Sequence, residues 1–325
     1  MYSPADFSDL PEFGVGHFTN LEALTGCTAF VARGDRAEGV TCAVDVRGGA
    51  PATRETDLLR PENMVQKANA VLIGGGSAYG LEAACGAMEA LRDAGAGFEL
   101  GGVRVPIVPA ACLFDLLIGK PVWPDKESGA IACKNALEYE GSSLAQGSVG
   151  AGAGCTIGKM GLSEQAAKSG FGWHGIRMGE LVVIASVAVN ALGNVMAEDG
   201  SWLAGVHDAE GNVLNPIEAA AAAMAQAEAA AAADAEGEGA PSNNTTLGVV
   251  LTNAKLTKAQ ATKVAQQTHD GYARAIKPVH TCNDGDAVFV MVSDKVDAMP
   301  DMVGIMAADA MEAAIRSAVR HSALA

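Results

Sequence analysis

Basic residues are scarce in this chain of 325 residues. Lys and Arg number 22 against 38 Asp and Glu, so the formal net charge is −16. An acidic chain repels phosphate backbones and anionic lipids. No apolar run reaches the roughly 18 residues that a membrane-spanning helix needs, and the opening "MYSPADFSDLPEFGVGH" lacks the basic and apolar regions of a secretory signal. We therefore expect a cytoplasmic protein that binds neither nucleic acid nor membranes.

Cysteine and histidine offer little for a metal site. The seven cysteines are widely spaced without a Cys-x-x-Cys motif, and the six histidines include no His-x-x-x-His pair. Most cysteines lie among small apolar residues, which is typical of buried, reduced thiols. We expect no metal, no cofactor and no disulfide framework.

Aromatic residues make up only 5% of the chain, whereas 49% of the residues are hydrophobic and 39 are glycine. This composition argues against general disorder and favours closely packed helices and strands with tight turns. The segments 25–32, 40–46 and 180–195 are typical of strands. Residues 70–95 predict a strand, a glycine turn and a helix, and "RVPIVPA" (104–110) predicts a further extended run.

The clearest boundary in the sequence precedes residue 245. Asn215 and Pro216 are good starting residues for an alanine-rich helix. Residues 235–243, "AEGEGAPSN", then have the composition of a flexible acidic linker. Strand, helix, strand and helix patterns follow it at 245–252, 257–276, 286–293 and 300–321, with Thr257 and Gln260 at capping-box spacing. This last unit is small for an independent domain, so we expect residues 245–325 to complete a sheet begun by residues 1–244 in one α/β domain.

Two glycine-rich stretches are candidate ligand loops. "GGGSAYG" (74–80) has Tyr79 where the dinucleotide fingerprint needs glycine, and it lacks the Gly-Lys-Ser/Thr of a P-loop. We interpret it as a tight turn that brings backbone segments close together. "GSVGAGAGCTIGKMG" (147–161) contains Lys159, which is either a solvated surface charge or a partly buried ammonium that stabilises negative charge.

Polar residues also occur beside apolar strands. Asn190 follows the most apolar part of the run 180–195, where it is either a structural amide or the donor of an oxyanion hole. Asp284 and Asp286 lie two apart in "CNDGDAVF", either as an ordinary turn or as a carboxylate pair that holds an ammonium and relays protons. The residues alone leave these alternatives open.

Thr245 follows the predicted linker and begins the predicted strand in "APSNNTTLGVVLTN". A threonine hydroxyl is a poor nucleophile unless a base lies beside it, and the α-amine of the same residue can be that base. The amine exists only after the preceding peptide bond has been cut. On chemistry alone, a loop entering a strand is the more ordinary explanation of this pattern.

Several stretches together resemble the P1-family peptidases, which include the D-esterase/L-aminopeptidase, the β-peptidyl aminopeptidases and the nylon-oligomer hydrolase. They include "FGVGHFTNLEALTGCTAFVA", "IGGGSAYGLEAACGAMEAL", "SVGAGAGCTIGK", "NNTTLGVVLTNAKLTKAQATKVAQQTHDGYARAIKPVHT" and "DGDAVF", and they extend from residue 13 to about 320. The resemblance implies an αββα sandwich. It also implies one self-cleavage before a Ser or Thr, which yields two subunits that remain together as a homotetramer of cleaved heterodimers.

By match of position, the resemblance places the cut between Asn244 and Thr245, so that residues 1–244 are the large subunit and Thr245 is the nucleophile. Asn190 matches the oxyanion-hole asparagine. Lys159, Asp284 and Asp286 match the nylon-oligomer branch, whereas the aminopeptidase branch carries Ser and Glu at the two acidic positions.

The resemblance also points to a substrate pocket. Phe114 falls where some members have a tyrosine, and it has no hydroxyl group to contribute. Ser77 and Tyr79 are further candidate pocket residues.

The resemblance predicts an aminopeptidase or amidase that acts on small peptides or amino-acid amides. The alternatives are an endo-acting hydrolase of ω-amino amides and a non-catalytic assembly or binding member of the fold. Because Thr245, Asn190, Asp284 and Asp286 are all present, the non-catalytic alternative is disfavoured.

Overall fold

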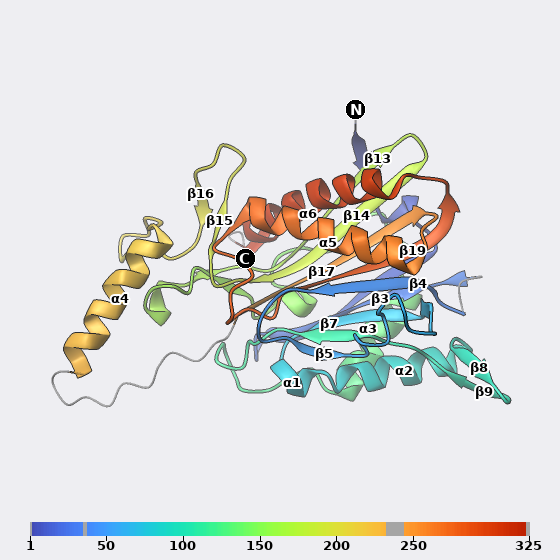
Figure 1. The fold of residues 1–325 in the computed structure, drawn as a ribbon. Helices are drawn as coiled ribbons and strands as arrows, with labels where there is room; N and C mark the ends of the chain where they lie inside the picture. The colour runs from blue at the N-terminus through green and yellow to red at the C-terminus, as the bar shows by residue number, and fades with distance from the viewer. Residues whose placement is uncertain (1, 35–37, 232–243, 323–325) are drawn as a thin grey trace.

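The computed structural model describes residues 2–34, 38–231 and 244–322. Two stacked β-sheets form its centre, and helices cover the outer face of each sheet (Figure 1). The order of layers is therefore αββα, as the family resemblance implies. The acidic linker predicted at 235–243 lies outside the described residues.

The larger sheet has seven strands. In spatial order they are β1 (Ser3–Ala5), β13 (Phe171–Met178), β14 (Leu181–Asn190), β17 (Thr245–Ala254), β19 (Ala287–Val296), β4 (Val40–Val46) and β6 (Lys67–Ala68). Strand β17 pairs antiparallel with β14 and parallel with β19. All ten residues of β14 and of β17 are buried, which explains why the sequence of β14 is almost continuously apolar.

The smaller sheet has five strands. In spatial order they are β2 (Phe13–Asn20), β3 (Thr25–Ala32), β7 (Ala70–Gly74), β10 (Ala110–Cys112) and β5 (Ala52–Arg54). Short pairings complete the β structure: β11 (Thr156–Ile157) with β12 (Ala167–Lys168), β8 (Phe98–Leu100) with β9 (Val103–Val105), and β15 (Asn194–Met196) between β16 (Trp202–Ala204) and β18 (Ile276–Lys277).

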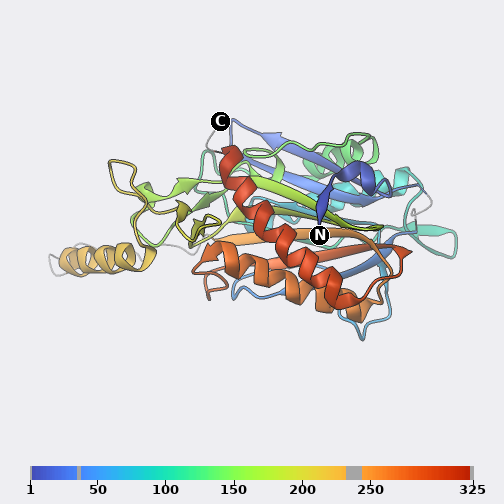
Figure 2. The ribbon, with the colours of Figure 1, turned by 90° about the horizontal axis from the view of Figure 1, so that it is seen from above.

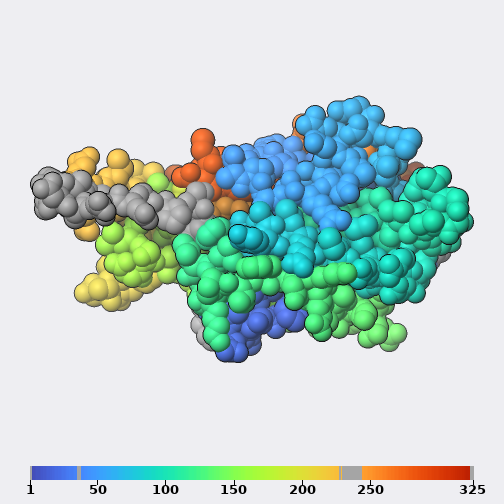
Figure 3. Space-filling view, turned by 90° about the horizontal axis from the view of Figure 1, so that it is seen from below, coloured from blue at the N-terminus to red at the C-terminus, as the bar shows by residue number. Residues whose placement is uncertain are grey.

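Two long helices, α5 (Lys258–Ala275) and α6 (Pro300–Ser322), pack side by side over the seven-stranded sheet (Figure 2). Helices α2 (Ala83–Asp93) and α3 (Lys126–Leu137) cover the five-stranded sheet, and their surroundings form the teal and green face in Figure 3. The other helical segments are α1 (Ser77–Gly80), α4 (Pro216–Ala231) and the 3-10 turns Phe7–Asp9, Gly150–Gly152 and Ser163–Gln165.

Three apolar cores correspond to the three contacts between layers. One joins α5 and α6 to the seven-stranded sheet, one fills the space between the two sheets, and one joins α2 and α3 to the five-stranded sheet. Alanine and glycine at the helix–sheet contacts allow the close approach that the composition predicts. In α6, for example, Ala314 and Ala318 pack over Gly172 of β13, where an added Cβ would lie 2.3 Å from the Ala314 carbonyl oxygen.

Local signals behave as predicted at several element ends. Thr257 caps α5 in a capping box with Gln260, and Asn215 Oδ1 accepts a hydrogen bond of 2.9 Å from the Ile217 amide at the start of α4. Helix α4 projects away from the body of the molecule (Figures 1 and 2).

All seven cysteines are free thiols and five are buried, whereas Cys282 is exposed.

The helix predicted after the glycine turn forms as α2, and the short α1 belongs to the turn itself, where the chain folds so tightly that a Cβ on Gly80 would lie 1.8 Å from the Gly75 carbonyl oxygen. One prediction needs correction. The extended run 104–110 is a strand only at its two ends, because Pro106 and Pro109 lack the amide hydrogen that a ladder needs. Within the described residues, no helix is long and apolar enough to cross a membrane.

Candidate active site

Thr245 and Asn190 are brought together by the pairing of two central strands. Thr245 begins β17 and Asn190 ends β14, and their Cα atoms are direct partners in the antiparallel ladder. Thr245 is 4% exposed and Asn190 is fully buried. The Thr245 hydroxyl donates a hydrogen bond to the carbonyl oxygen of Asn244. The hydroxyl therefore lies beside the peptide bond that it would have to attack in self-cleavage.

The side-chain amide of Asn190 is held by hydrogen bonds on both its nitrogen and its oxygen. Its Nδ2 donates to the Phe114 carbonyl oxygen at 2.9 Å, and its Oδ1 accepts from Lys159 Nζ at 2.7 Å and from the Thr156 amide at 3.1 Å. These contacts fix the orientation of the amide and leave it no freedom to rotate. A rigid NH₂ group beside Thr245 suits an oxyanion-hole donor, although the same contacts would hold a structural asparagine.

Lys159 lies on the loop after β11 and is partly buried. Its amide donates to the Leu192 carbonyl oxygen at 2.8 Å, so the loop is anchored just beyond the end of β14. Burial lowers the pKa of Lys159 to about 7, although the nearby Cys155 and Asp284 act in the opposite direction. The amine can therefore gain or lose a proton near neutral pH.

The lowered pKa predicts a pH dependence of stability. Unfolded Lys159 has an ordinary pKa of about 10.4, so between about pH 7 and 10.4 the unfolded chain binds a proton that the folded chain does not. The contribution of Lys159 to the free energy of unfolding should therefore rise with pH through this window. Urea unfolding of the Lys159→Met variant and of its Lys159 parent, both carrying Thr245→Ala, measures this contribution. A stability difference that is constant from pH 7 to 10 would contradict the shifted pKa.

Asp284 and Asp286 lie on the loop that leads into β19, and each is only 1% exposed. Asp286 Oδ1 accepts a hydrogen bond of 2.7 Å from the Thr246 amide. Asp284 Oδ2 accepts from the amide and hydroxyl of Thr281 at 2.8 and 2.6 Å. Burial and the neighbouring Asp286 raise the pKa of Asp284. The two carboxyl groups are therefore close enough to influence each other beside the start of β17.

Two glycines in this region act through their backbones. The Gly285 amide donates to the Asn244 carbonyl oxygen at 3.1 Å, and a Cβ on Gly285 would lie 2.6 Å from Thr245 Oγ1. The Gly48 amide donates to the Asp286 carbonyl oxygen at 3.1 Å, and a Cβ there would lie 2.3 Å from the Asp284 carbonyl oxygen. Neither glycine was predicted from the sequence, because a backbone donor leaves no side-chain signal. The glycine between two aspartates in "DGD" is a weak sequence signal for Gly285.

Two of the candidate pocket residues, Ser77 and Phe114, are partly buried near Asn190, and the third, Tyr79, is exposed. Phe114 is partly buried, and its carbonyl oxygen contacts Asn190. The Ser77 amide donates to the Leu113 carbonyl oxygen at 2.8 Å, next to Phe114 in the chain. Tyr79 is 61% exposed and stacks on Trp123 with ring centroids 4.6 Å apart. The structure thus places Ser77 and Phe114 on the segments that contact Asn190, and it places Tyr79 in an exposed aromatic pair with Trp123.

Asp115 is a buried carboxyl group that sequence reasoning missed. It is 2% exposed, and it accepts hydrogen bonds of 2.7 Å from the Thr25 hydroxyl and from the Gly76 amide. A Cβ on Gly75 would lie 2.0 Å from Asp115 Oδ2, so the glycine turn is shaped around this carboxyl group. Burial raises its pKa. The tight-turn interpretation of residues 74–80 is confirmed, and Asp115 is the partner of that turn.

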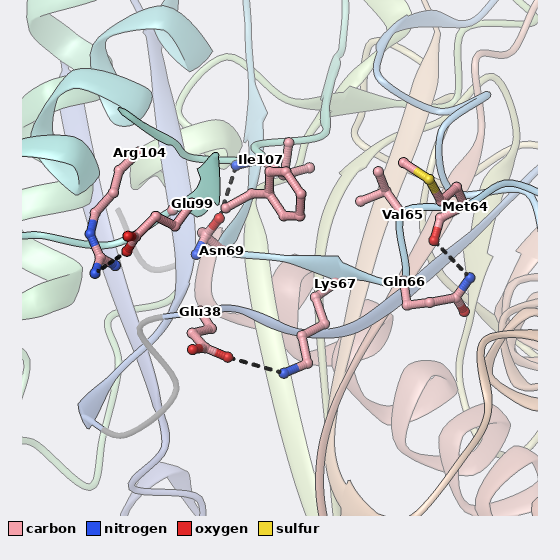
Figure 4. A pocket seen from close by; sticks show the side chains of 11 residues that line it. Glu38, Met64, Val65, Gln66, Lys67, Asn69, Glu99, Arg104 and Ile107 are labelled. Atoms are coloured by element: carbon pink, nitrogen blue, oxygen red, sulfur yellow. Dashed lines mark hydrogen bonds and ion pairs between the residues drawn. The ribbon is translucent and has the colours of Figure 1, made fainter. Parts of the chain in front are cut away.

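A cavity of about 490 Å³ lies elsewhere, between β6 and the β8–β9 hairpin (Figure 4). None of the predicted site residues lines it. Its charged side chains are paired with one another, Lys67 with Glu38 at 3.9 Å and Arg104 with Glu99 at 2.8 Å. Since it offers no nucleophile, we place the candidate site at Thr245. Among the described residues, no cluster of His, Cys, Asp and Glu is arranged to hold a metal ion.

Comparison with known proteins gives a consistent family. The sequence profile of peptidase family S58 matches residues 6–325. An uncharacterized aminopeptidase of Mycobacterium tuberculosis is 37% identical over 329 residues, which covers 97% of this chain and 89% of the relative. A 6-aminohexanoate-oligomer endohydrolase of Paenarthrobacter ureafaciens is 28% identical over 295 residues, covering 89% of this chain and 75% of the relative.

Solved structures have the same fold. The L-aminopeptidase D-Ala-esterase/amidase of Ochrobactrum anthropi, described as a variant of the Ntn-hydrolase fold, superimposes with a TM-score of 0.67 at 17% identity, over 98% of this chain and 88% of that one. A Burkholderia β-aminopeptidase superimposes with a TM-score of 0.64 at 19% identity, over the same shares of the two chains. The αββα fold, the matching profile and the relatives agree: the chain belongs to peptidase family S58 and is a hydrolase of peptide or amide bonds.

Proposed function

We propose that this protein is a self-cleaving amide hydrolase whose nucleophile is the N-terminal threonine of its cleaved form, Thr245. The observation that carries the proposal is the contact between the Thr245 hydroxyl and the Asn244 carbonyl group at the start of a buried strand. The Gly285 amide, which donates to the same carbonyl oxygen, is placed to stabilise negative charge that develops there.

The self-cleavage would proceed in two steps. Thr245 Oγ attacks the Asn244 carbonyl carbon, and the C–N bond breaks as the acyl group moves from nitrogen to oxygen. Water then hydrolyses the resulting ester, which restores the hydroxyl, leaves a carboxylate on Asn244 and frees the Thr245 α-amine. That amine has an ordinary pKa near 8, so it can act as the base for the same hydroxyl at neutral pH.

In substrate hydrolysis the surrounding groups take distinct roles. Asn190 Nδ2, with Lys159 beside it, stabilises the oxyanion of the tetrahedral intermediate. Asp286 accepts a hydrogen bond from the Thr246 amide and orients the neighbouring Thr245 amine. Asp284 shuttles protons. The substrate class that we propose is small peptides and amino-acid amides.

The cleavage is tested by N-terminal sequencing and mass measurement of the purified protein. We expect two chains, residues 1–244 and 245–325, in a mass ratio of roughly three to one. The reason is that the scissile carbonyl, the hydroxyl and the Gly285 donor are already in contact in the uncut chain. A single 32.9 kDa chain that hydrolyses amides after long incubation at neutral pH would exclude the proposal.

Endo-acting hydrolysis of ω-amino amides is the second candidate. It is favoured by the combination of Lys159, Asp284 and Asp286, which matches the nylon-oligomer branch, and by relatives named 6-aminohexanoate-oligomer endohydrolase.

An amino-acid p-nitroanilide and its N-acetylated form separate the two candidates. Because a nearby carboxylate stabilises an ammonium group and acetylation removes that charge, we expect acetylation of the substrate amine to lower kcat/KM. If kcat/KM is unchanged or higher for the acetylated compound, the endo-acting candidate is correct.

A further inference from the structure

Two histidines extend the site from Asp286 toward strand β4. His280 Nδ1 lies 2.8 Å from Asp286 Oδ2, and His280 Nε2 lies 3.2 Å from His269 Nδ1. His269 Nε2 lies 3.2 Å from the Asp45 carbonyl oxygen. Since the other oxygen of Asp286 accepts from the Thr246 amide at 2.7 Å, a continuous chain of hydrogen bonds connects the start of β17 with the end of β4.

The two rings are held firmly in place. The His269 side chain projects from α5 and is fully buried, and its ring meets that of His280 edge to face, with centroids 4.6 Å apart. Tyr272, one turn further along α5, stacks on His280 at 5.6 Å. His280 has a φ of 57°, a left-handed backbone conformation that is uncommon outside glycine. Such conformations persist where the surroundings impose them and are frequent at functional sites.

The geometry determines how many protons the chain of hydrogen bonds holds. It has three contacts, Asp286–His280, His280–His269 and His269–Asp45, and each contact needs one proton. Two neutral imidazoles supply only two. The Asp45 carbonyl oxygen can only accept, so His269 Nε2 must donate to it and His269 Nδ1 must accept from His280 Nε2. A third proton is then required between His280 Nδ1 and Asp286.

Both ends of this arrangement favour placing the third proton on His280. Burial and the neighbouring His280 lower the pKa of His269 to about 3, so His269 is neutral. Asp286 accepts hydrogen bonds from the Thr246 amide and, at 3.2 Å, from the His280 amide. Both oxygens of Asp286 therefore already accept from backbone amides, and an ionised carboxylate can only accept, which leaves the third proton on His280.

We propose that His280 is an imidazolium ion, held between His269 and Asp286, which compensates the charge of Asp286 next to the Thr245 amine. His280 and His269 are positioning residues of the hydrolase, and this inference rests on the proposed function of Thr245. Their role is to keep Asp286 in place as a hydrogen-bond acceptor without letting its full negative charge stabilise the ammonium form of Thr245.

Other charged and titratable groups face the same rings. They are Tyr272 on α5, and Asp45 and Arg47 at the end of β4, where Arg47 Nε pairs with Asp45 Oδ2 at 2.7 Å. Asp284 lies near Asp286, whose charge helps to raise the pKa of Asp284. Arg47 and Asp45 largely offset each other, and burial together with the neighbouring Asp286 charge keeps Tyr272 protonated by raising its pKa. His280 is therefore the cation nearest to Asp286 along the chain of hydrogen bonds.

The consequence can be measured as a pH profile. In His280→Asn, the side-chain amide can still donate to Asp286, but the compensating positive charge is lost. The uncompensated carboxylate then favours the ammonium form of Thr245, which cannot act as a base. We expect the acidic limb of kcat/KM to move to higher pH by about one unit or more. His174→Asn, which changes an exposed histidine on β13, should not move the limb. A fall in kcat/KM without a shift of the limb would mean that His280 is merely structural.

A second measurement does not depend on hydrolase activity. Selective ¹⁵N labelling of the six histidines in the uncut Thr245→Ala chain reports the protonation of each ring. We expect both ring nitrogens of His280, but only one of His269, to carry a proton at neutral pH. A neutral His280 ring overturns the proposal even if the hydrolase function is correct. An imidazolium at His280, combined with a parent protein that remains uncut and inactive, would count against the proposed role of Thr245 alone.

His269→Gln provides a second variant in case His280→Asn does not fold. It removes the ring that accepts from His280 Nε2 and should therefore shift the pH profile in the same direction by a smaller amount. If His269→Gln folds and its profile coincides with that of the parent, the chain of hydrogen bonds has no influence on the Thr245 amine, and the proposal is wrong.

Discussion

The Thr245→Ala variant should fold, remain a single uncut chain and lose all amidase activity. Alanine has no oxygen for the attack on Asn244 or for the attack on a substrate, so both reactions depend on the same missing atom. Folding should survive because the backbone ladder of Thr245 with Asn190 is unchanged. The variant is checked by mass measurement of the purified chain and by hydrolysis of an amino-acid p-nitroanilide.

Two further variants complete this test. Thr245→Ser keeps the hydroxyl and should still be cleaved, at a changed rate. Thr246→Val keeps the backbone amide that contacts Asp286 and removes only a buried hydroxyl that has no hydrogen-bond partner among the described residues, so it should be cleaved and active. Cleavage of Thr245→Ala at the same bond would show that another residue is the nucleophile, with Thr246 the first to examine.

The Asn190→Ala variant should lower kcat by about 10²–10³-fold, which is the usual effect of losing one oxyanion donor. The substitution removes the NH₂ group beside Thr245, and it also removes the oxygen that accepts from Lys159 at 2.7 Å. Self-cleavage should slow as well if the same donor serves both reactions. The measurements are kcat and KM of the cleaved enzyme and the rate of appearance of the two chains.

Asn194 provides the matched control. It is also a fully buried asparagine near the end of β14, and its amide bridges the Leu214 carbonyl oxygen at 2.9 Å and the Val206 amide at 3.0 Å. Asn194→Ala should destabilise the fold without a specific effect on kcat. If kcat of Asn190→Ala stays within a few-fold of the parent, then Asn190 is structural in the same sense.

The layers of the fold could be predicted because the local and global signals agree. The runs at 25–32 and 40–46 are strands with those bounds, and the helix caps at Thr257 and Asn215 form as their spacing predicts. The prediction failed at the extended run 104–110, where Pro106 and Pro109 cannot donate to a ladder and the strand forms only at the two ends.

The site was predictable only in part. Thr245, Asn190 and the Asp284–Asp286 pair carry distinctive side chains in distinctive places, and the strands bring them together. His269 and His280 appeared unrelated because one lies on a helix and the other on a loop. Their contact depends on how that loop crosses α5, which no spacing rule describes. Gly285 and Gly48 contribute only backbone, so their contribution becomes visible only in three dimensions.

The position of β17 has a consequence for how the protein can be handled. This strand lies inside the seven-stranded sheet, bonded to β14 on one side and β19 on the other. A cut before Thr245 would leave the sheet intact but turn one polypeptide into two. Refolding of the cut protein would then be a second-order reaction, and its unfolding midpoint would rise with protein concentration. The uncut Thr245→Ala chain, by contrast, would refold by itself at any dilution.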